Sequence, residues 1–286
     1  MKRPSLVICC ALLGLSPAAC GDAVDPDPGV DRSDSTMVDL DHLTISVTGH
    51  AELFPEAARL LEAQGQAVPS LEGRPLIIEE PLRVGVSDAN SVLGRGDIGA
   101  TGAFSVHDVP VRDIHLSLAA SFEQQGFVRS STVVFDTVFT RTRPRTDIIG
   151  ARVWALPTSF HDALTRAVGE SWIRAHTDDR ARTLREAGFI LGRVVDASGT
   201  PVAGARVVLD RGDLAHRVYY PAPDFQSATQ DATSATGLFI YVHSGEAAES
   251  FGLSIQGSRD YQPRNAGAAA GMGLVLTLYP GRSPPP

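Results

Sequence analysis

A five-residue motif occurs twice in this chain, and the two copies have similar surroundings. Ala100-Thr101-Gly102-Ala103-Phe104 returns as Ala235-Thr236-Gly237-Leu238-Phe239, and an alternating apolar segment that contains Leu-Ser follows each copy. Repetition at this scale indicates a duplicated structural unit, and the alternation is typical of β-strands. We expect each glycine to form a turn and each phenylalanine to begin a core strand. The repeat therefore predicts a mainly β chain built from two related modules.

The first module is expected at residues 42–156. Short apolar or alternating segments with Gly, Pro and Asp between them are typical of a sandwich or barrel. A helical insertion near 54–65 interrupts the pattern, because Pro55 suits a helix start and alanines and leucines follow it. The strands are expected at 43–47, 76–78, 82–86, 103–106, 114–119, 127–135 and 148–155.

A helical connector is predicted at residues 157–188. Ser159 and Asp162 have the spacing of a capping box, and apolar residues follow at helical spacing. A second helix is expected to begin at Thr177 and to end at Gly188.

The second module, residues 189–281, opens with the most specific stretch of the chain. A strand up to Val195 is followed by a tight turn at 196–199, a return through Pro201 and Gly204, and a partner strand at 205–209. With the later Ala-Thr-Gly-x-Phe turn, this stretch resembles the carboxypeptidase regulatory-like domain. The resemblance implies a transthyretin-like Greek-key β-sandwich and an accessory rather than a catalytic role. The whole chain is thus expected to hold two transthyretin-like Greek-key sandwiches joined by a short helical connector, with a Pro-rich tail at 282–286.

The N-terminus has the features of an export signal. Lys2 and Arg3 precede an apolar run from Leu6 to Leu15 that is too short to span a bilayer as a helix. Residues 1–19 are predicted to be the signal peptide, because Ala18, Ala19 and Cys20 resemble a bacterial lipoprotein box. Pro17 stands where that box usually has an aliphatic residue, so ordinary secretion of a soluble periplasmic or extracellular protein is the alternative.

Cysteine usage favours lipidation of Cys20. Cys9 and Cys10 lie in the signal, so Cys20 is the only cysteine of the mature chain, which leaves no internal disulfide and no cysteine pair for zinc. Residues 20–41 are rich in aspartate and are expected to form a disordered acidic tether. The predicted protein is an exported, membrane-anchored lipoprotein of the cell envelope.

The charge and the remaining motifs exclude several functions. The net charge is −8 and the arginines form no basic stripe, so nucleic acid is not an expected partner. The segment 94–99 matches a dinucleotide fingerprint, but another strand follows it in place of a helix, and we interpret it as a glycine-rich turn. His243 and Glu246 have the spacing of half a zinc peptidase site, yet no later histidine completes it. No metal, no cofactor and no catalytic residue are predicted, and His161 and Asp162 are expected to point to different faces of their helix.

Two observations leave binding functions open. Arg-Gly-Asp, a tripeptide that resembles the integrin-binding sequence, occurs at 95–97 and again at 211–213. We interpret both glycines as turn residues, and adhesion to integrins is the alternative. Tyr219, Tyr220 and Phe225 lie in a proline-restrained segment and could bind sugars or proteins if exposed, or pack against the connector helices if buried. The leading hypothesis is a non-enzymatic binding or scaffold module whose partner is a protein or a polysaccharide of the envelope. The alternatives are carbohydrate recognition by these three rings and, less favoured, a divergent hydrolase.

Overall fold

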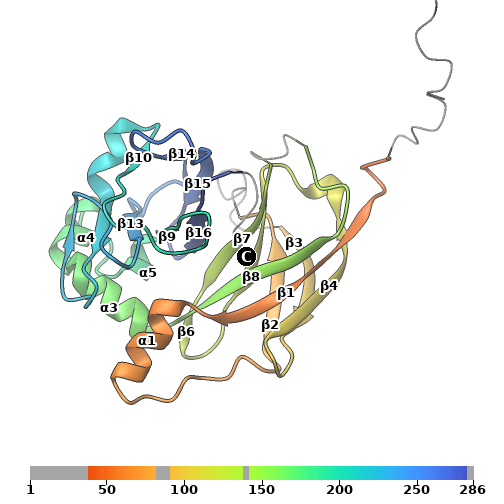
Figure 1. The fold of residues 1–286 in the computed structure, drawn as a ribbon, viewed down its shortest axis with the longest axis horizontal. Helices are drawn as coiled ribbons and strands as arrows, with labels where there is room; N and C mark the ends of the chain where they lie inside the picture. The colour runs from red at the N-terminus through yellow and green to blue at the C-terminus, as the bar shows by residue number, and fades with distance from the viewer. Residues whose placement is uncertain (1–37, 82–90, 138–141, 282–286) are drawn as a thin grey trace, which may run out of the picture. The chain divides into compact units, whose positions relative to one another are not determined.

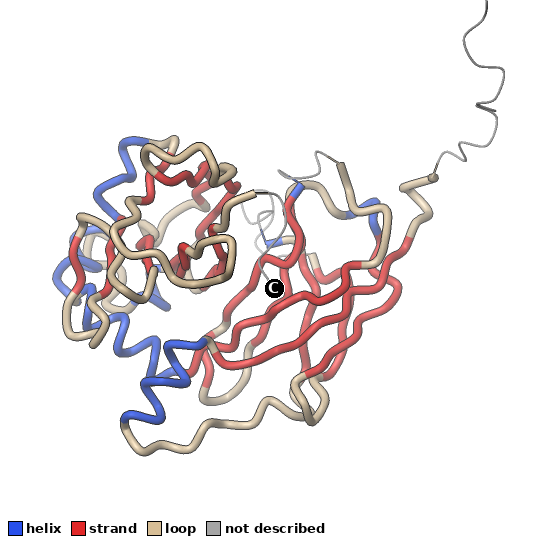
Figure 2. Tube along the Cα trace, viewed as in Figure 1, coloured by secondary structure: helices blue, strands red, loops and turns tan. Residues whose placement is uncertain are grey.

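The computed structural model describes residues 38–81, 91–137 and 142–281, and strands dominate its trace (Figure 2). These described residues do not include the expected signal peptide, Cys20, most of the expected tether, the expected strand at 82–86 or the Pro-rich tail. Val38–Pro286 group as one compact unit. Among the described residues no helix is long and apolar enough to cross a membrane.

The first half of the described chain is a sandwich of two sheets. Its strands are β1 (Thr44–Leu53), β2 (Pro75–Glu79), β3 (Val92–Asp97), β4 (Ala103–Pro110), β5 (Ser117–Phe122), β6 (Phe127–Val128), β7 (Ser130–Asp136) and β8 (Ile148–Pro157). One sheet has the order β4-β1-β8-β6, and the strands β3, β2, β5 and β7 lie opposite it (Figure 1). The helical insertion is confirmed as α1 (Pro55–Ala63), and its proline stands at the start as predicted.

The second half repeats this plan. Its strands are β9 (Phe189–Val194), β10 (Val207–Leu209), β11 (Val218–Pro221), β12 (Ala228–Thr229), β13 (Leu238–Val242), β14 (Glu249–Ile255), β15 (Arg264–Ala268) and β16 (Gly273–Leu278). The strands β10, β14 and β15 form a separate sheet over β13, β9 and β16. The mainly β sandwich fold is therefore confirmed.

The repeated motif occupies the same place in both halves. In the first half β1 lies between antiparallel β4 and parallel β8, and in the second half β9 lies between antiparallel β13 and parallel β16. Gly102 accepts a hydrogen bond from the Ala51 amide at 2.8 Å, and Gly237 accepts one from the Val194 amide at 2.8 Å. Both glycines have positive φ, 86° and 68°, which β-carbon-bearing residues rarely adopt. The turn and the core strand after it are thus confirmed as a duplicated element.

The two sandwiches share one sheet. Strand β16 of the second half pairs in parallel with β7 of the first half, with Gly273 opposite Ser130 and Val275 opposite Thr132. This pairing joins the order β12-β11-β13-β9-β16 to β7-β5-β2-β3, which makes nine strands in one sheet. A side chain at Gly273 would meet the Phe189 ring at 2.8 Å and the Arg129 carbonyl at 3.1 Å, so close packing requires glycine at the junction.

A shared core lies beside this junction. Residues of the first half and of the connector pack with residues of the second half in one apolar cluster, which includes Phe54, Trp154, Phe160, Phe189, Leu191 and Leu238. Each half also has a core of its own between its sheets. Because both halves contribute to the central cluster, separating them would expose apolar surface.

Two details of the predicted β architecture are wrong. The segment 94–99 is largely strand β3, not a turn, because β4 lies so close that a side chain at Gly94 would meet Val106 at 2.6 Å. The expected hairpin partner of β9 is also wrong, since β10 pairs with β14 in the opposite sheet. Across the tight turn, Val195 and Pro201 form an isolated bridge, and the Val202 amide donates to the Val194 carbonyl at 2.9 Å. The glycine of 95–97 therefore lies in a strand, and that of 211–213 opens a 3-10 helix, Gly212–Arg217.

The connector is helical, but its helix boundaries differ from those expected. It consists of α3 (Thr158–Val168), α4 (Glu170–His176) and α5 (Leu184–Ala187). The predicted capping box at Ser159 is wrong, since Pro157 precedes α3 without a side-chain cap. The second helix does not begin at Thr177, which ends α4; the capping box lies at Thr183 and Glu186 instead. The end at Gly188 is confirmed.

Candidate functional site

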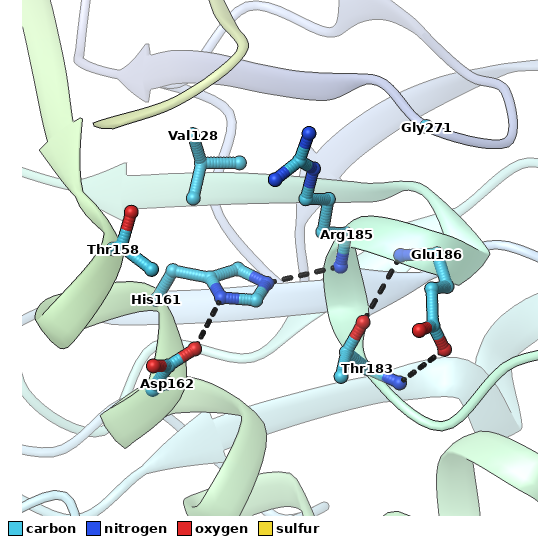
Figure 3. Close-up of a pocket in the computed structure, with 8 residues that line it drawn as sticks. All are labelled: Val128, Thr158, His161, Asp162, Thr183, Arg185, Glu186 and Gly271. Atoms are coloured by element: carbon cyan, nitrogen blue, oxygen red, sulfur yellow. Dashed lines mark hydrogen bonds and ion pairs between the residues drawn. The ribbon is translucent and has the colours of Figure 1, made fainter. Parts of the chain in front are cut away.

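A cleft of about 500 Å³ lies between the connector helices, strand β6 and the turn that holds Gly271. Figure 3 shows its lining, in which α3 and α5 face each other across the His161 ring. The lining residues are Val128, Thr158, His161, Asp162, Thr183, Arg185, Glu186 and Gly271.

His161 is the central side chain of this cleft, and both of its ring nitrogens are engaged. Nε2 accepts a hydrogen bond from the Arg185 amide at 3.0 Å, so the ring proton stands on Nδ1, which donates to Asp162 Oδ1 at 3.0 Å (Figure 3). The imidazole is buried, and burial lowers its pKa. His161 is therefore a neutral bridge between α3 and α5.

The expectation that His161 and Asp162 point apart is wrong. Neighbouring residues leave a helix about 100° apart, yet the half-exposed Asp162 side chain turns back over the buried ring. Since neither nitrogen of His161 is free, the pair cannot deprotonate a serine or a water without first giving up a structural hydrogen bond.

Glu186 is likewise engaged in structure. Its Oε2 accepts from the Arg182 and Thr183 amides at 2.7 and 3.2 Å, while its own amide donates to Thr183 Oγ1 at 3.2 Å. This reciprocal pattern is a capping box that begins α5.

The groups that remain free in the cleft suit recognition. Among the described residues, no hydrogen bond occupies the Arg185 guanidinium or the Thr158 hydroxyl, and Asp162 keeps one carboxylate oxygen. A guanidinium, a hydroxyl and a carboxylate around one cleft can bind a polar or charged group. Nothing in this arrangement supplies an activated nucleophile.

The three aromatic residues singled out from the sequence are buried. Tyr219, Tyr220 and Phe225 are between 3% and 6% exposed. The Tyr219 hydroxyl bonds His176 Nε2 at 2.7 Å, and Phe225 packs edge-on against Phe160 of α3 at 5.3 Å. Tyr220 bonds the Val207 amide at 2.8 Å. The interpretation that they pack against the connector is confirmed for Tyr219 and Phe225, and an exposed aromatic platform at these residues is not what the structure shows.

The zinc-like and Arg-Gly-Asp motifs have structural roles. His243 is fully buried between the Ala187 and Ala247 carbonyls, and Glu246 pairs with Arg180 at 2.7 Å. No cluster of three or more metal-binding side chains occurs among the residues that the structure describes. Arg211 binds Asp213 of its own tripeptide at 2.6 Å, which occupies both charged groups.

Two buried carboxylates were missed in the sequence. Glu80 accepts from the His115 and Leu116 amides, both at 2.7 Å, and Glu79 accepts from Ser121 and Ser131. Two adjacent glutamates at a strand end gave no pattern that predicts burial. Their bonds fix loop and strand positions in the first sandwich.

Trp172 was also missed. It lies on α4, is 56% exposed and stacks on His176. A tryptophan on the polar side of a short helix is the sequence signal that could have marked it.

No family model matches this chain, and no curated protein matches it significantly. The shaft pilin SpaA from Lactobacillus rhamnosus GG is similar over 85% of this chain and all of its own, with 12% identity and a TM-score of 0.23. A streptococcal ancillary pilin is similar over 85% of this chain and 70% of its own, at 8% identity and a TM-score of 0.22. The Bacillus anthracis TIE protein is similar over 83% of this chain and 34% of its own, with 8% identity and a TM-score of 0.22. Likenesses this slight carry no inference about fold or function.

Proposed function

We propose that this protein is an exported, non-enzymatic scaffold of the cell envelope, in which two β-sandwiches act as one binding body on a lipid tether. The observation that carries the proposal is the β16–β7 pairing, which makes one sheet of strands from both halves. Sites on either sandwich are then held at a fixed spacing, as a scaffold requires.

Two ion pairs that cross from one half to the other support the fusion of the halves. Arg264 Nε of β15 contacts Asp136 Oδ2 of β7 at 3.0 Å. Arg193 Nη2 of β9 lies 3.4 Å from Glu56 Oε1 of α1. Both pairs join a residue of the first half to a residue of the second, so both would break if the halves moved apart.

The proposed location in the cell envelope rests on the N-terminal sequence. An apolar run from Leu6 to Leu15 and a single mature cysteine at Cys20 support export and lipidation. The resemblance of residues 189–281 to the carboxypeptidase regulatory-like domain supports an accessory role. Against the divergent hydrolase stands the engagement of both His161 nitrogens. Against sugar recognition by Tyr219, Tyr220 and Phe225 stands their burial.

Labelling cells with a palmitate analogue tests the tether. The wild-type protein should incorporate the label and sediment with membranes, whereas Cys20→Ser should do neither. Cys9→Ser is the matched control, because that cysteine leaves with the signal, and it should behave as the wild type. Incorporation of the label into the Cys20→Ser protein would contradict lipidation at Cys20.

Chemical unfolding tests whether the two sandwiches unfold together as one unit. Guanidinium chloride should unfold the chain in one transition, with the same midpoint whether tryptophan fluorescence or far-UV circular dichroism is followed. Two separate transitions would contradict a fused scaffold.

A further inference from the structure

A cluster of four rings stands outside the cleft, where α4 meets the 3-10 helix Gly212–Arg217. The His176 ring lies in its middle: Trp172 stacks on it at 6.5 Å between ring centres, and His216 lies at 5.2 Å. The Tyr219 hydroxyl completes the cluster through its hydrogen bond to His176 Nε2 at 2.7 Å. His216 and Trp172 are exposed, and His176 is half-buried.

The hydrogen bonds leave nitrogens free for a ligand. Tyr219 occupies Nε2 of His176, and no hydrogen bond among the described residues occupies its Nδ1 or either nitrogen of His216. A histidine that binds a metal commonly has its other nitrogen bonded to a neighbouring group, which fixes the ring orientation. Tyr219 can play that part for His176.

The ring separation fits a shared ion. Metal–nitrogen bonds of about 2 Å place each imidazole centre roughly 3 Å from the ion, so two rings on one tetrahedral ion have centres about 5 Å apart. The observed 5.2 Å between His176 and His216 matches this value. Because His216 is exposed, its ring can turn to aim a nitrogen at the ion without disturbing the core.

The electrostatics are compatible with a cation. The nearby Arg217 guanidinium is paired with Glu249 at 2.9 Å, which offsets its positive charge.

From this geometry we infer a surface site in which His176 and His216 bind one divalent transition-metal ion, with Tyr219 orienting His176. No third histidine, cysteine or carboxylate joins them among the described residues, so water or a ligand of the ion completes the coordination. Two imidazoles favour Cu²⁺, Ni²⁺ or Zn²⁺ over Mg²⁺ or Ca²⁺, and Cu²⁺ should bind most tightly.

Trp172 offers a direct readout, because its stacked ring would be quenched by a bound Cu²⁺. The test uses untagged chain from residue 20 onward with Cys20→Ser, which contains the whole unit Val38–Pro286. Titration with Cu²⁺ should quench the emission saturably at one ion per chain, and calorimetry should give the same stoichiometry. Trp172→Phe should lose most of the quenching but keep the calorimetric binding.

Variants separate this site from general surface binding. His176→Gln and His216→Gln should each abolish the saturable phase. Tyr219→Phe should weaken it about 10–100-fold, as loss of an orienting partner does. His42→Gln, at an exposed histidine outside the cluster, should leave it unchanged. Each variant is checked by circular dichroism for an intact fold.

Saturable quenching that persists in a folded His176→Gln or His216→Gln variant would overturn the site. So would a lack of saturable quenching in the Cys20→Ser chain that carries no other substitution. Neither result depends on whether the protein is lipidated or acts as a scaffold.

Discussion

Gly192 and Phe239 stand opposite each other on β9 and β13, and the phenylalanine ring fills the space that a side chain at Gly192 would need. The β-carbon of an alanine there would lie 1.9 Å from Phe239 Cζ. In the first half Gly49 stands opposite Phe104, and its close neighbour is the Ala151 carbonyl of the parallel strand. The phenylalanine of each repeated motif thus faces a glycine that close packing requires.

Gly192→Ala should therefore destabilise the protein by overpacking. We expect a loss of about 1–3 kcal/mol in the free energy of unfolding, measured with guanidinium chloride. Gly212→Ala is the matched control, because no atom lies within 4 Å of its added β-carbon, and its midpoint should stay near that of the wild type. Equal midpoints for the two variants would contradict the packing described for Phe239.

Asp136→Asn tests the buried ion pair between the halves. Removing the carboxylate charge leaves Arg264 buried beside a neutral amide, and breaking such a pair costs about 3–5 kcal/mol. Asp213→Asn disrupts an exposed pair with Arg211 and should leave stability unchanged. A similarly small effect for Asp136→Asn would show that this pair does not hold the halves together.

The lowered pKa values of His161 and His176 predict how the stability of the fold changes with pH. Burial lowers the pKa of His161, and that of His176 falls to about 4 from an ordinary value of 6.5. The unfolded chain then binds more protons below pH 6.5, so their contribution is complete above this pH and is lost as the pH falls towards 4.

His176→Gln removes one of these groups. The wild type should lose more stability between pH 7 and pH 5 than this variant does, in urea titrations at both pH values. His42→Gln, an exposed control, should keep the wild-type pH dependence. If His176→Gln shows an unchanged pH dependence, then His176 is not held neutral by the fold.

Local patterns in the sequence predicted much of the fold. The repeated turn, the helix at Pro55 and the helix end at Gly188 each depend on a residue with a fixed backbone preference, so their positions could be read directly. Strand β3 was missed because Gly94 and Gly96 are used for close approach to β4 rather than for a turn.

The long-range features could not be predicted in this way. The parallel pairing of Gly273 with Ser130 joins residues far apart in the sequence, and no turn chemistry marks it. The bridging role of His161 depends on the amide of Arg185, which belongs to another helix. The cluster of His176 and His216 likewise needs two elements that only the tertiary fold brings together.

The central claim is that the two sandwiches form one rigid body, and distances between spin labels test it most directly. Arg152 of β8 and Ser250 of β14 are exposed, one in each half. In a chain that starts at residue 20, Cys20→Ser leaves no other cysteine to react with the label. Labels on Arg152→Cys and Ser250→Cys should give a single distance peak. It should be as narrow as that of a control pair within the second half, Thr229→Cys and Ser250→Cys. A broad or double peak across the halves, beside a narrow one within the second half, would contradict the account.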